Sequence, residues 1–550
     1  MICKKEKEGS QNMIQNPILK GFCPDPSIIR VGQDYYIATS TFEWWPGVKL
    51  FHSTDLKNWE QIPSPLRRES QLNMVGDPPS GGIWAPCLSY DGERFFLVFT
   101  DVKTKKGNYY NTHNYVVWTD DIYGEWSEPV YLNSIGFDPS LFHDTDGKKY
   151  LINMVNGFKG ILVQEVDPKT FALIGERKKV YPGSGLGYTE GPHMYHIGDW
   201  YYLLVAEGGT GYEHCVTMAR AKTIWGPFET APDNPILTSD RDNMNALQKC
   251  GHADFTDTPE GEWYMVHLCS RPLNGQKWCT LGRETAIQRM KWDEDGWLRP
   301  AYGGKYAQMV VPQPGEACGT TGDYVAEGAL PQEEQGAKPW QFRDDFADEQ
   351  LNVRYSSPRV PLGTCADLKS RGSHLRLTGR ESLNSLHHVS LVAVRQQAVS
   401  ESAETVLEFA PDYSEQLAGL TYLYDALNFY ILGQTSTEDG KSVLTLIRSD
   451  RGTITGETDP IPVPDNSKVY LRAEISGDGT EIQFFYDFAS KDSGENEREP
   501  RIWKAVGPAL TTQTMTDEYC RGFTGAHFGL YCHDMTGLSY IADFDYFAVE

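Results

Sequence analysis

One motif recurs five times before residue 311, and this repeat limits the fold more than any other feature of the sequence. Each copy consists of a short strand, a turn rich in Gly and Asp, and a second strand rich in aromatic residues. The copies are PSIIRVGQDYYIATS, CLSYDGERFFLVFT, SLFHDTDGKKYLINM, HMYHIGDWYYLLVA and DFTDTPEGEWYMVHL. A further apparent strand and a turn marked by Trp or Asp follow each copy. Four strands in each of five units predict a β-propeller with five blades.

The residues that open the five units recur at intervals of 59, 54, 52 and 62 positions. They are Asp25, Trp84, Asp138, Glu190 and His252. In a propeller, the innermost strand of every blade starts at the same end of the central channel. The repeat therefore predicts that these five side chains, although far apart in the sequence, meet in one pocket on the propeller axis.

The sequence changes character after residue 311. Residues 312–339 are rich in Pro, Gly and acidic side chains and lack apolar periodicity, which is typical of a surface linker. From Trp340 onward, alternating strands such as ETVLEFA and IQFFYDF return and predict a two-sheet sandwich. We therefore expect an all-β chain with a propeller over 14–311, then the linker, and a jelly-roll-like β-sandwich over 340–550.

The composition excludes several classes of partner. With a formal net charge of −25, the chain would repel the phosphates of nucleic acids and the anionic surface of a membrane. The sequence contains no apolar run of roughly 18 residues, so no transmembrane helix is expected. Aromatic residues make up 12% of the chain, and their flat faces suit stacking on the C–H faces of neutral sugar rings.

The cysteines and the N-terminal sequence bear on the compartment. The eleven cysteines form no C-x-x-C pairs, and several lie inside apparent strands, which favours free thiols in a reducing compartment. The stretch MICKKEKEGSQNM has no apolar segment of the kind found in a secretory signal. The expectation from the sequence is a cytoplasmic protein.

Three of the five converging residues are carboxylates: Asp25 in GFCPDPS, Asp138 in GFDPSLF and Glu190 in YTEGPH. A charged residue at the start of a buried strand is costly unless it is paired or functional. A single Asp at such a position often caps a turn. Three acids at matching positions in different blades instead favour a catalytic site. Hydrolysis of a glycosidic bond needs a proton donor and a base or nucleophile, and a third carboxylate helps to keep the donor protonated.

Other candidates near this pocket are less specific. Arg283, in TLGRETAIQ, is a candidate for binding sugar hydroxyls and a carboxylate, although an inter-blade ion pair is the alternative. Trp84 and Phe42 are candidates for pocket walls or for core residues. His252 is either a packed residue or the ligand of a water or ion in the channel. The sequence has no HExxH, EF-hand or GxSxG motif, so neither a catalytic metal nor a serine nucleophile is predicted.

These motifs together resemble glycoside hydrolase family 43, and within it the β-xylosidases with a C-terminal β-sandwich. The resemblance runs from Asn16 through nearly the whole chain, in NPILKGFCPDPSIIRVGQDYYIATSTFEWWPGV, GGIWAPCLSY, GFDPSLFHDTDGKKYL, YTEGPHMY, GEWYMVHLCSRPL and CTLGRETAIQRMKW. It implies an inverting exo-hydrolase, without a required cofactor, that releases D-xylose from the non-reducing ends of short β-1,4-xylooligosaccharides. Asp25 matches the general base and Glu190 the general acid. Asp138 matches the third acid, which tunes the pKa of the donor.

The resemblance also implies how the substrate is held. Arg283 matches the residue that binds hydroxyls of the terminal sugar, and Trp84 and Phe42 match pocket walls. His252 matches a channel histidine that in some relatives lies beside a calcium ion or a water. Phe523, in FTGAHFGLY, matches a loop of the sandwich domain that closes over the pocket and leaves room for chain ends only.

Two departures from the family pattern concern the substrate. Cys23 precedes the PDPS motif where His, Asn or Tyr is expected, and Trp45 replaces an expected Phe. An α-L-arabinofuranosidase or a bifunctional enzyme is therefore an alternative, and a non-catalytic carbohydrate-binding protein is an alternative of another class. A fructan hydrolase is set aside because WMNDPNG and RDP are absent from the sequence. Relatives often form dimers or tetramers, so a homo-oligomer is expected.

Overall fold

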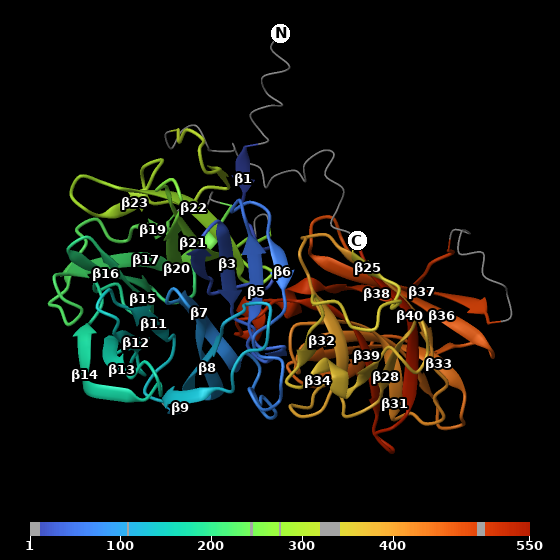
Figure 1. Cartoon of the computed structure of the whole chain (residues 1–550). Helices are drawn as coiled ribbons and strands as arrows, with labels where there is room; N and C mark the ends of the chain where they lie inside the picture. The colour runs from blue at the N-terminus through green and yellow to red at the C-terminus, as the bar shows by residue number, and fades with distance from the viewer. Residues whose placement is uncertain (1–11, 107–108, 242–245, 274–276, 320–341, 492–500) are drawn as a thin grey trace, which may run out of the picture.

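The computed structural model describes residues 12–106, 109–241, 246–273, 277–319, 342–491 and 501–550. These residues form two β-rich domains that lie next to each other (Figure 1). From residue 320 onward, the linker predicted over 312–339 falls outside the described residues. No helix within the described ranges is long and apolar enough to cross a membrane.

The first domain is a five-bladed β-propeller, as the repeat predicts. Each blade is an antiparallel sheet whose strands follow one another in chain order. Blade 1 contains β2 (Ser27–Val31), β3 (Asp34–Thr39), β5 (Lys49–Ser53) and β6 (Glu60–Ile62), and blade 2 contains β7 (Gly82–Tyr90), β8 (Phe95–Lys106), β9 (Tyr109–Thr119) and β10 (Val130–Asn133). Blade 3 contains β11 (Ser140–His143), β12 (Lys149–Met154), β13 (Ile161–Val166) and β14 (Leu173–Tyr181). Blade 4 contains β15 (Glu190–Ile197), β16 (Trp200–Glu207), β17 (Cys215–Ala221), β18 (Glu229–Thr230) and the short β19 (Leu237–Thr238), and blade 5 contains β20 (Gln248–Asp257), β21 (Trp263–Ser270), β22 (Glu284–Trp292) and β23 (Leu298–Pro300).

The second strand of each blade explains why the repeat is rich in apolar residues. Successive side chains of a strand point to opposite faces, and both faces of a blade pack against neighbouring blades. Consecutive residues such as Leu203 and Leu204 therefore belong to different apolar clusters, one facing blade 3 and the other facing blade 5. The same division separates Leu151 from Ile152 in blade 3. A strand buried on both faces reads as a continuous apolar run, which is the pattern that the five copies show.

The ring of blades is closed next to the N-terminal end of the described chain. Strand β1 (Met13–Gln15) pairs with β24 (Val310–Pro312), which follows blade 5. The side-chain amide of Asn16 donates hydrogen bonds of 2.8 Å to the backbone oxygens of Ile287 and Gln308. These bonds tie the start of the propeller to its last blade.

The second domain is a sandwich of two antiparallel sheets. One sheet has the order β27-β28-β40-β30-β36-β37-β38 with β25 added to β40, and the other has the order β29-β39-β31-β32-β33-β34 with β35 added to β33. The bounds in the first sheet are β25 (Phe342–Asp344), β27 (Ala366–Asp367), β28 (Leu375–Thr378), β30 (Ser402–Glu408), β36 (Ser467–Ile475), β37 (Glu481–Ser490), β38 (Lys504–Thr511) and β40 (Ile541–Val549). Those in the second are β29 (Ser390–Arg395), β31 (Gln416–Leu423), β32 (Phe429–Ser436), β33 (Ser442–Asp450), β34 (Thr453–Gly456), β35 (Ile461–Pro462) and β39 (His527–Asp534). Short helices η1 (Leu362–Thr364), η2 (Thr512–Met515) and α2 (Asp517–Cys520) complete the domain.

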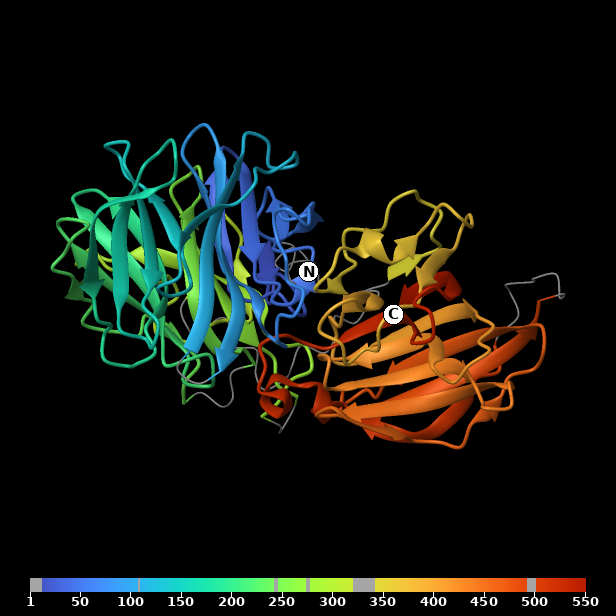
Figure 2. The same cartoon turned by 90° about the horizontal axis from the view of Figure 1, so that it is seen from below.

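The two domains are joined by direct contacts. Strand β26 (Ser357–Pro358) of the sandwich pairs with β4 (Trp44–Trp45) of the propeller. Around α2, Glu518 accepts a hydrogen bond of 2.5 Å from Lys249, at the junction that the red C-terminal segment reaches in Figure 2. This bond fixes a loop of the sandwich against the propeller near the start of β20, the inner strand of blade 5.

Candidate active site

Each of the five blades has a residue in the left-handed backbone conformation near the start of its innermost strand, either within the strand or just before it. The residues at this position, with their φ angles, are Asp25 (54°), Ala85 (35°), Asp138 (51°), Gly191 (56°) and His252 (45°). Side chains rarely adopt this conformation, and it persists where the surrounding structure enforces it. Trp84 and Glu190 stand one residue before this position. The residues selected from the sequence spacing are therefore one position early in blades 2 and 4.

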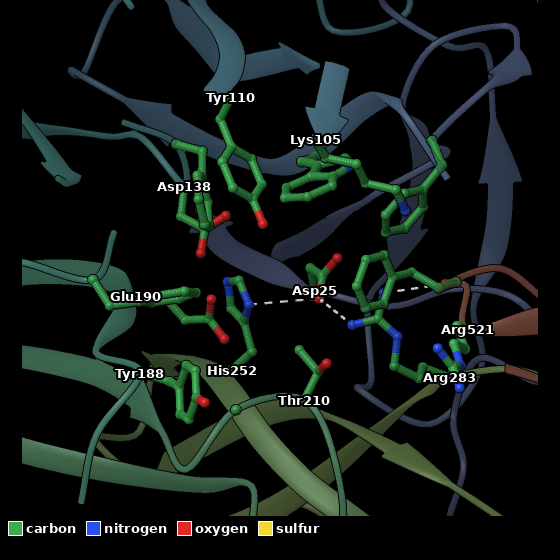
Figure 3. Close-up of a pocket in the computed structure, with 16 residues that line it drawn as sticks. Asp25, Lys105, Tyr110, Asp138, Tyr188, Glu190, Thr210, His252, Arg283 and Arg521 are labelled. Carbon is green, nitrogen blue, oxygen red and sulfur yellow. Dashed lines mark hydrogen bonds and ion pairs between the residues drawn. The ribbon is translucent and has the colours of Figure 1, made fainter. Parts of the chain in front are cut away.

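One pocket of about 440 Å³ lies where these strands begin, and all eight residues that the sequence selects line it (Figure 3). These residues are Asp25, Phe42, Trp84, Asp138, Glu190, His252, Arg283 and Phe523. Seven come from the propeller and Phe523 comes from the sandwich domain. The regular spacing of the blades thus brings together residues that are up to 498 positions apart in the sequence.

Asp25 lies in a polar, positively charged environment. It accepts hydrogen bonds from the Ser40 hydroxyl at 2.7 Å and from Nη1 of Arg283 at 3.2 Å. Nδ1 of His252 lies 3.5 Å from the same carboxylate. Burial by itself would raise the pKa of Asp25, but Arg283, His252 and Ser40 together outweigh it and lower the pKa below its ordinary value. Asp25 is therefore ionised at neutral pH.

Glu190 and Asp138 experience the opposite effect. Burial first, and then the charges of Asp138 and Asp25, raise the pKa of Glu190 well above its ordinary value. Burial and the charge of Asp25 raise the pKa of Asp138 to about 8, although the backbone N–H of Gly191 donates a 3.0 Å hydrogen bond to its carboxylate. The two acids titrate as a pair. At neutral pH, the pocket therefore holds one ionised carboxylate, Asp25, and two carboxyl groups whose raised pKa values keep them protonated, Asp138 and Glu190.

Aromatic rings and a guanidinium form the wall beside Asp25. The ring centroids of Phe42, Trp84 and Phe523 lie 5.8 to 6.0 Å from one another, and Trp84 stands perpendicular to Phe523 with an interplanar angle of 81°. The guanidinium carbon of Arg283 lies 5.5 Å from the centroid of Phe42 and 5.4 Å from that of Phe523. Its Nε atom is buried and has no hydrogen-bond partner among the described residues. A buried donor of this kind is suited to a ligand oxygen.

His252 lies in the channel floor behind Asp25. Burial lowers its pKa to about 4, so the imidazole is neutral near pH 7. In the part of the chain that the structure describes, no group of three or more His, Cys, Asp or Glu side chains is arranged to hold a metal ion. Calcium prefers six to eight oxygen ligands, more than the Asp25 carboxylate beside His252 supplies by itself. The channel calcium or water stays a prediction.

The structure also adds eight lining residues that the sequence analysis missed. They are Lys105, Tyr110, Phe137, Phe158, Tyr188, Gly209, Thr210 and Arg521. Most of them lie on connections between strands, outside the repeated motif. Tyr188 stands two residues before Glu190 and Phe137 stands directly before Asp138, and these proximities were signals available in the sequence. Ser40 was missed as well, although it binds Asp25 and accepts a 2.8 Å hydrogen bond from the backbone N–H of Ala85.

Cys23 and Trp45, the two departures from the family pattern, do not line the pocket. Cys23 is buried between blades 1 and 5, and its carbonyl oxygen accepts a hydrogen bond of 2.6 Å from Thr285. Trp45 is buried in the apolar cluster between blades 1 and 2. Their side chains point into interfaces between blades, so neither departure changes the lining of the pocket directly.

Comparison with known proteins agrees with this geometry in both domains. Residues 14–298 match the family described as glycosyl hydrolases family 43, and residues 343–550 match the beta xylosidase C-terminal concanavalin A-like domain. The chain belongs to glycosyl hydrolase family 43. It is therefore a glycoside hydrolase, with the five-bladed propeller and C-terminal sandwich described above.

Individual members of family 43 resemble the whole chain. A beta-xylosidase of Bacillus subtilis is 44% identical, and the match covers 97% of this chain and 99% of that protein. The xylosidase/arabinosidase 43B of Humicola insolens is also 44% identical, with 97% of each chain covered. The crystal structure of a xylan beta-1,4-xylosidase from Bacillus halodurans has a TM-score of 0.89 and 44% identity, and the match covers 98% of this chain and all of that one.

Proposed function

We propose that this family 43 member is an inverting exo-β-D-xylosidase that releases D-xylose from the non-reducing ends of short β-1,4-xylooligosaccharides. The observation that carries the proposal is the contrast between Asp25, whose pKa is lowered, and Glu190, whose pKa is raised. Glycoside hydrolysis needs one ionised and one protonated carboxyl group at the same pocket. A protein that only binds sugars has no need of such a contrast.

In the proposed reaction, Asp25 accepts a proton from a water molecule as that water attacks the anomeric carbon of the terminal xylose. Glu190 donates its proton to the glycosidic oxygen, which departs with the rest of the oligosaccharide. The hydrogen bond from Ser40 and the ion pair with Arg283 hold the Asp25 carboxylate in one orientation. Burial is the first cause that keeps Glu190 protonated, and the charge of Asp138 adds to it once the pH passes the pKa of Asp138, which is about 8. The inverting outcome rests on the resemblance to family 43.

Binding of the terminal sugar is assigned to the aromatic wall and to Arg283. Phe42, Trp84 and Phe523 offer apolar faces to the ring, and the unpartnered Nε of Arg283 supplies a donor to a sugar hydroxyl. Phe523 comes from the sandwich domain, and its backbone N–H is held by the Ser80 hydroxyl at 3.0 Å. A pocket closed by this loop admits the end of a chain, which supports exo-action.

Cleavage of α-L-arabinofuranosides is a second candidate activity, because some relatives are named for it. A non-reducing end alpha-L-arabinofuranosidase of Bacteroides ovatus is 33% identical, and the match covers 98% of this chain and 95% of that protein. Xylopyranose and arabinofuranose present their hydroxyls in similar positions, so one pocket can accept both.

We also propose a cytoplasmic location. Its support is that the ten described cysteines are all free thiols, eight of them buried, which suits a reducing compartment.

The deciding experiment compares 4-nitrophenyl β-D-xylopyranoside, 4-nitrophenyl α-L-arabinofuranoside and xylobiose as substrates. Strong cleavage of the xyloside and xylobiose is the expected result, and α-xylose as the first product in an NMR time course would support inversion. Cleavage of the arabinofuranoside alone would replace the substrate and keep the mechanism. No cleavage of any of the three would reject the proposed activity and favour a binding protein.

A further inference from the structure

The sixteen pocket-lining residues divide by burial into a floor and a rim. The floor consists of the seven buried residues, namely Asp25, Phe42, Phe137, Asp138, Glu190, His252 and Arg283. The rim consists of the nine residues that are half-buried or exposed, namely Trp84, Lys105, Tyr110, Phe158, Tyr188, Gly209, Thr210, Arg521 and Phe523. Because the three acids lie in the floor, the leaving part of the substrate is expected to extend through the rim.

The two parts of the pocket differ in charge. All three acids lie in the floor, whereas the rim contains two cations, Lys105 and Arg521, and no acid. The rim thus has a positive charge, although the chain as a whole has a formal net charge of −25. Within the floor, Asp25 is paired with Arg283, and the raised pKa values of the other two acids reduce their negative charge. The acids of the floor therefore do not cancel the positive charge of the rim, although Glu43, Asp425 and Asp517 act on Lys105 from outside the pocket lining.

Neither rim cation has an ionic partner of its own. Among the described residues, the side chains of Lys105 and Arg521 form no hydrogen bond or ion pair. The Lys105 ammonium instead lies 4.5 Å from the centroid of the Phe523 ring. Lys105 is on β8 of blade 2, and Arg521 ends α2 of the sandwich domain, so each domain supplies one cation. Both remain available to a ligand.

The aromatic side of the rim is built to hold a second sugar ring. Phe158 and Tyr188 meet edge to face with ring centroids 5.1 Å apart, and 58% of Tyr188 is exposed. Phe158, Tyr188 and Arg521 all have left-handed backbone conformations, with φ angles of 52° to 56°. Seven of the 20 non-glycine residues with positive φ in the described chain line this one pocket. Such concentration of backbone strain is a mark of functional positions.

We propose that the rim selects substrates whose leaving part carries a carboxylate, such as a xylooligosaccharide that ends in an aldonic acid or bears a uronic acid. The inference rests on the proposed xylosidase function and adds the substrate class. The leaving sugar stacks on the aromatic side next to Glu190, and its carboxylate reaches Lys105 and Arg521, which lie on the other side of the mouth in Figure 3. Ion pairs at such half-exposed positions strengthen attraction modestly and weaken as salt rises.

The test uses two aryl xylosides that differ in charge. In 4-carboxyphenyl β-D-xylopyranoside the leaving group is an anion, and in 4-carbamoylphenyl β-D-xylopyranoside it is a neutral group of nearly the same shape. The measured quantity is the ratio of their kcat/KM values at pH 6.5, where Lys105 is charged because burial lowers its pKa only to about 8. Xylobionate and xylobiose form a second pair made of natural sugars.

The wild-type enzyme is expected to prefer each anionic substrate by roughly fourfold to 25-fold, with about two- to fivefold from each cation. Lys105→Met and Arg521→Met should each lower the ratio toward one, Lys105→Arg should retain it, and about 0.5 M NaCl should reduce it. Lys106→Met is the matched control, because Lys106 is exposed on the same strand and does not line the pocket.

Two results would overturn the inference while leaving the proposed function intact. One is a wild-type ratio of one or less although both neutral substrates are cleaved. The other is a high ratio that both methionine variants retain. Failure to cleave xylobiose and the neutral aryl xyloside would instead overturn the proposed function, and the inference with it.

Discussion

Nη2 of Arg283 donates a hydrogen bond of 3.1 Å to the backbone carbonyl oxygen of Phe523, and this bond links the propeller to the sandwich inside the pocket. Nη1 of the same guanidinium binds Asp25 at 3.2 Å. The sandwich domain thus helps to fix the cation that lowers the pKa of the proposed base. The loop that carries Phe523 therefore has two effects: it closes the pocket, and it helps to lower the pKa of Asp25 through Arg283.

Gly282 offers a way to disturb this link. It has a φ of +68°, and a Cβ at this position would lie 2.1 Å from the carbonyl oxygen of Thr524. Gly282→Ala should displace the loop and weaken the Arg283–Asp25 pair, which raises the pKa of Asp25. Because the base must be ionised, the acidic limb of the kcat/KM profile should move to higher pH. Gly304→Ala is the matched control, since Gly304 has the same φ of +68° with nothing within 4 Å. An unmoved limb in Gly282→Ala would show that the loop does not tune the base.

The ring of Phe523 can be separated from its backbone carbonyl by Phe523→Ala. This variant keeps the hydrogen bond to Arg283 but removes the ring that faces Phe42 and Trp84. We expect KM for xylobiose to rise several-fold while the pH limbs stay in place, because stacking is lost and the base is untouched. Steady-state kinetics across pH measure both effects. Unchanged KM would show that the ring does not contact the terminal sugar.

Asp25→Asn should reduce kcat on xylobiose by about 10² to 10⁴-fold, the usual contribution of a general base. The amide preserves the shape of the side chain and can still accept a hydrogen bond from Ser40. Thermal unfolding should show that the fold is retained. Asp34→Asn in the same blade is the control, because the Asp34 carboxylate pairs with His52 and does not line the pocket. Activity close to wild type in Asp25→Asn would end its assignment as the base.

The repeat explains why so much of the floor could be predicted from the sequence. The start of each inner strand is fixed by blade geometry, so the positions of Asp25, Asp138 and His252 follow from spacing alone. Trp84 and Glu190 were selected by spacing too, although the structural repeat places Ala85 and Gly191 at the left-handed position. A shift of one residue is small against intervals of more than 50, which is why the pattern still pointed to the right pocket.

Apart from Trp84 and Phe523, the rim could not be predicted in the same way. Phe158 and Tyr188 lie on connections whose course depends on local left-handed backbone rather than on strand periodicity. Arg521 belongs to another domain, and nothing in its local sequence indicates that α2 packs against the propeller. Cys23 and Trp45 show the opposite case. They are close to the motif in sequence, but their side chains are buried in interfaces between blades and do not line the pocket.

Glu190→Ala should have an effect that depends on the leaving group. A glycosidic oxygen of xylobiose needs a proton to depart, whereas an activated nitrophenolate does not. We expect kcat to fall by about 10² to 10⁴-fold on xylobiose and much less on 4-nitrophenyl β-D-xylopyranoside. Rates on both substrates, measured with the same enzyme preparation, give the comparison. Equal losses on the two would contradict the role of Glu190 as the acid.

Asp138→Asn tests how Glu190 is kept protonated. Burial is the first cause of the raised pKa of Glu190, and the charge of Asp138 is the second. Activity requires protonated Glu190, so it falls as pH rises through that pKa. Asn removes the charge of Asp138 but can still accept the hydrogen bond from the Gly191 N–H. The pKa of Glu190 should then drop, and the basic limb of the kcat/KM profile should move to lower pH.

The control for this shift is Asp146→Asn, an exposed carboxylate of the same blade that should leave the profile unchanged. Asp138→Ala adds a second comparison, because it removes both the charge and the acceptor for Gly191. If both Asp138 variants move the basic limb equally, charge is the means by which Asp138 acts on Glu190. If only Asp138→Ala loses activity and neither variant moves the limb, Asp138 acts by holding the Glu190–Gly191 turn in place, and its proposed effect on the pKa of Glu190 is wrong.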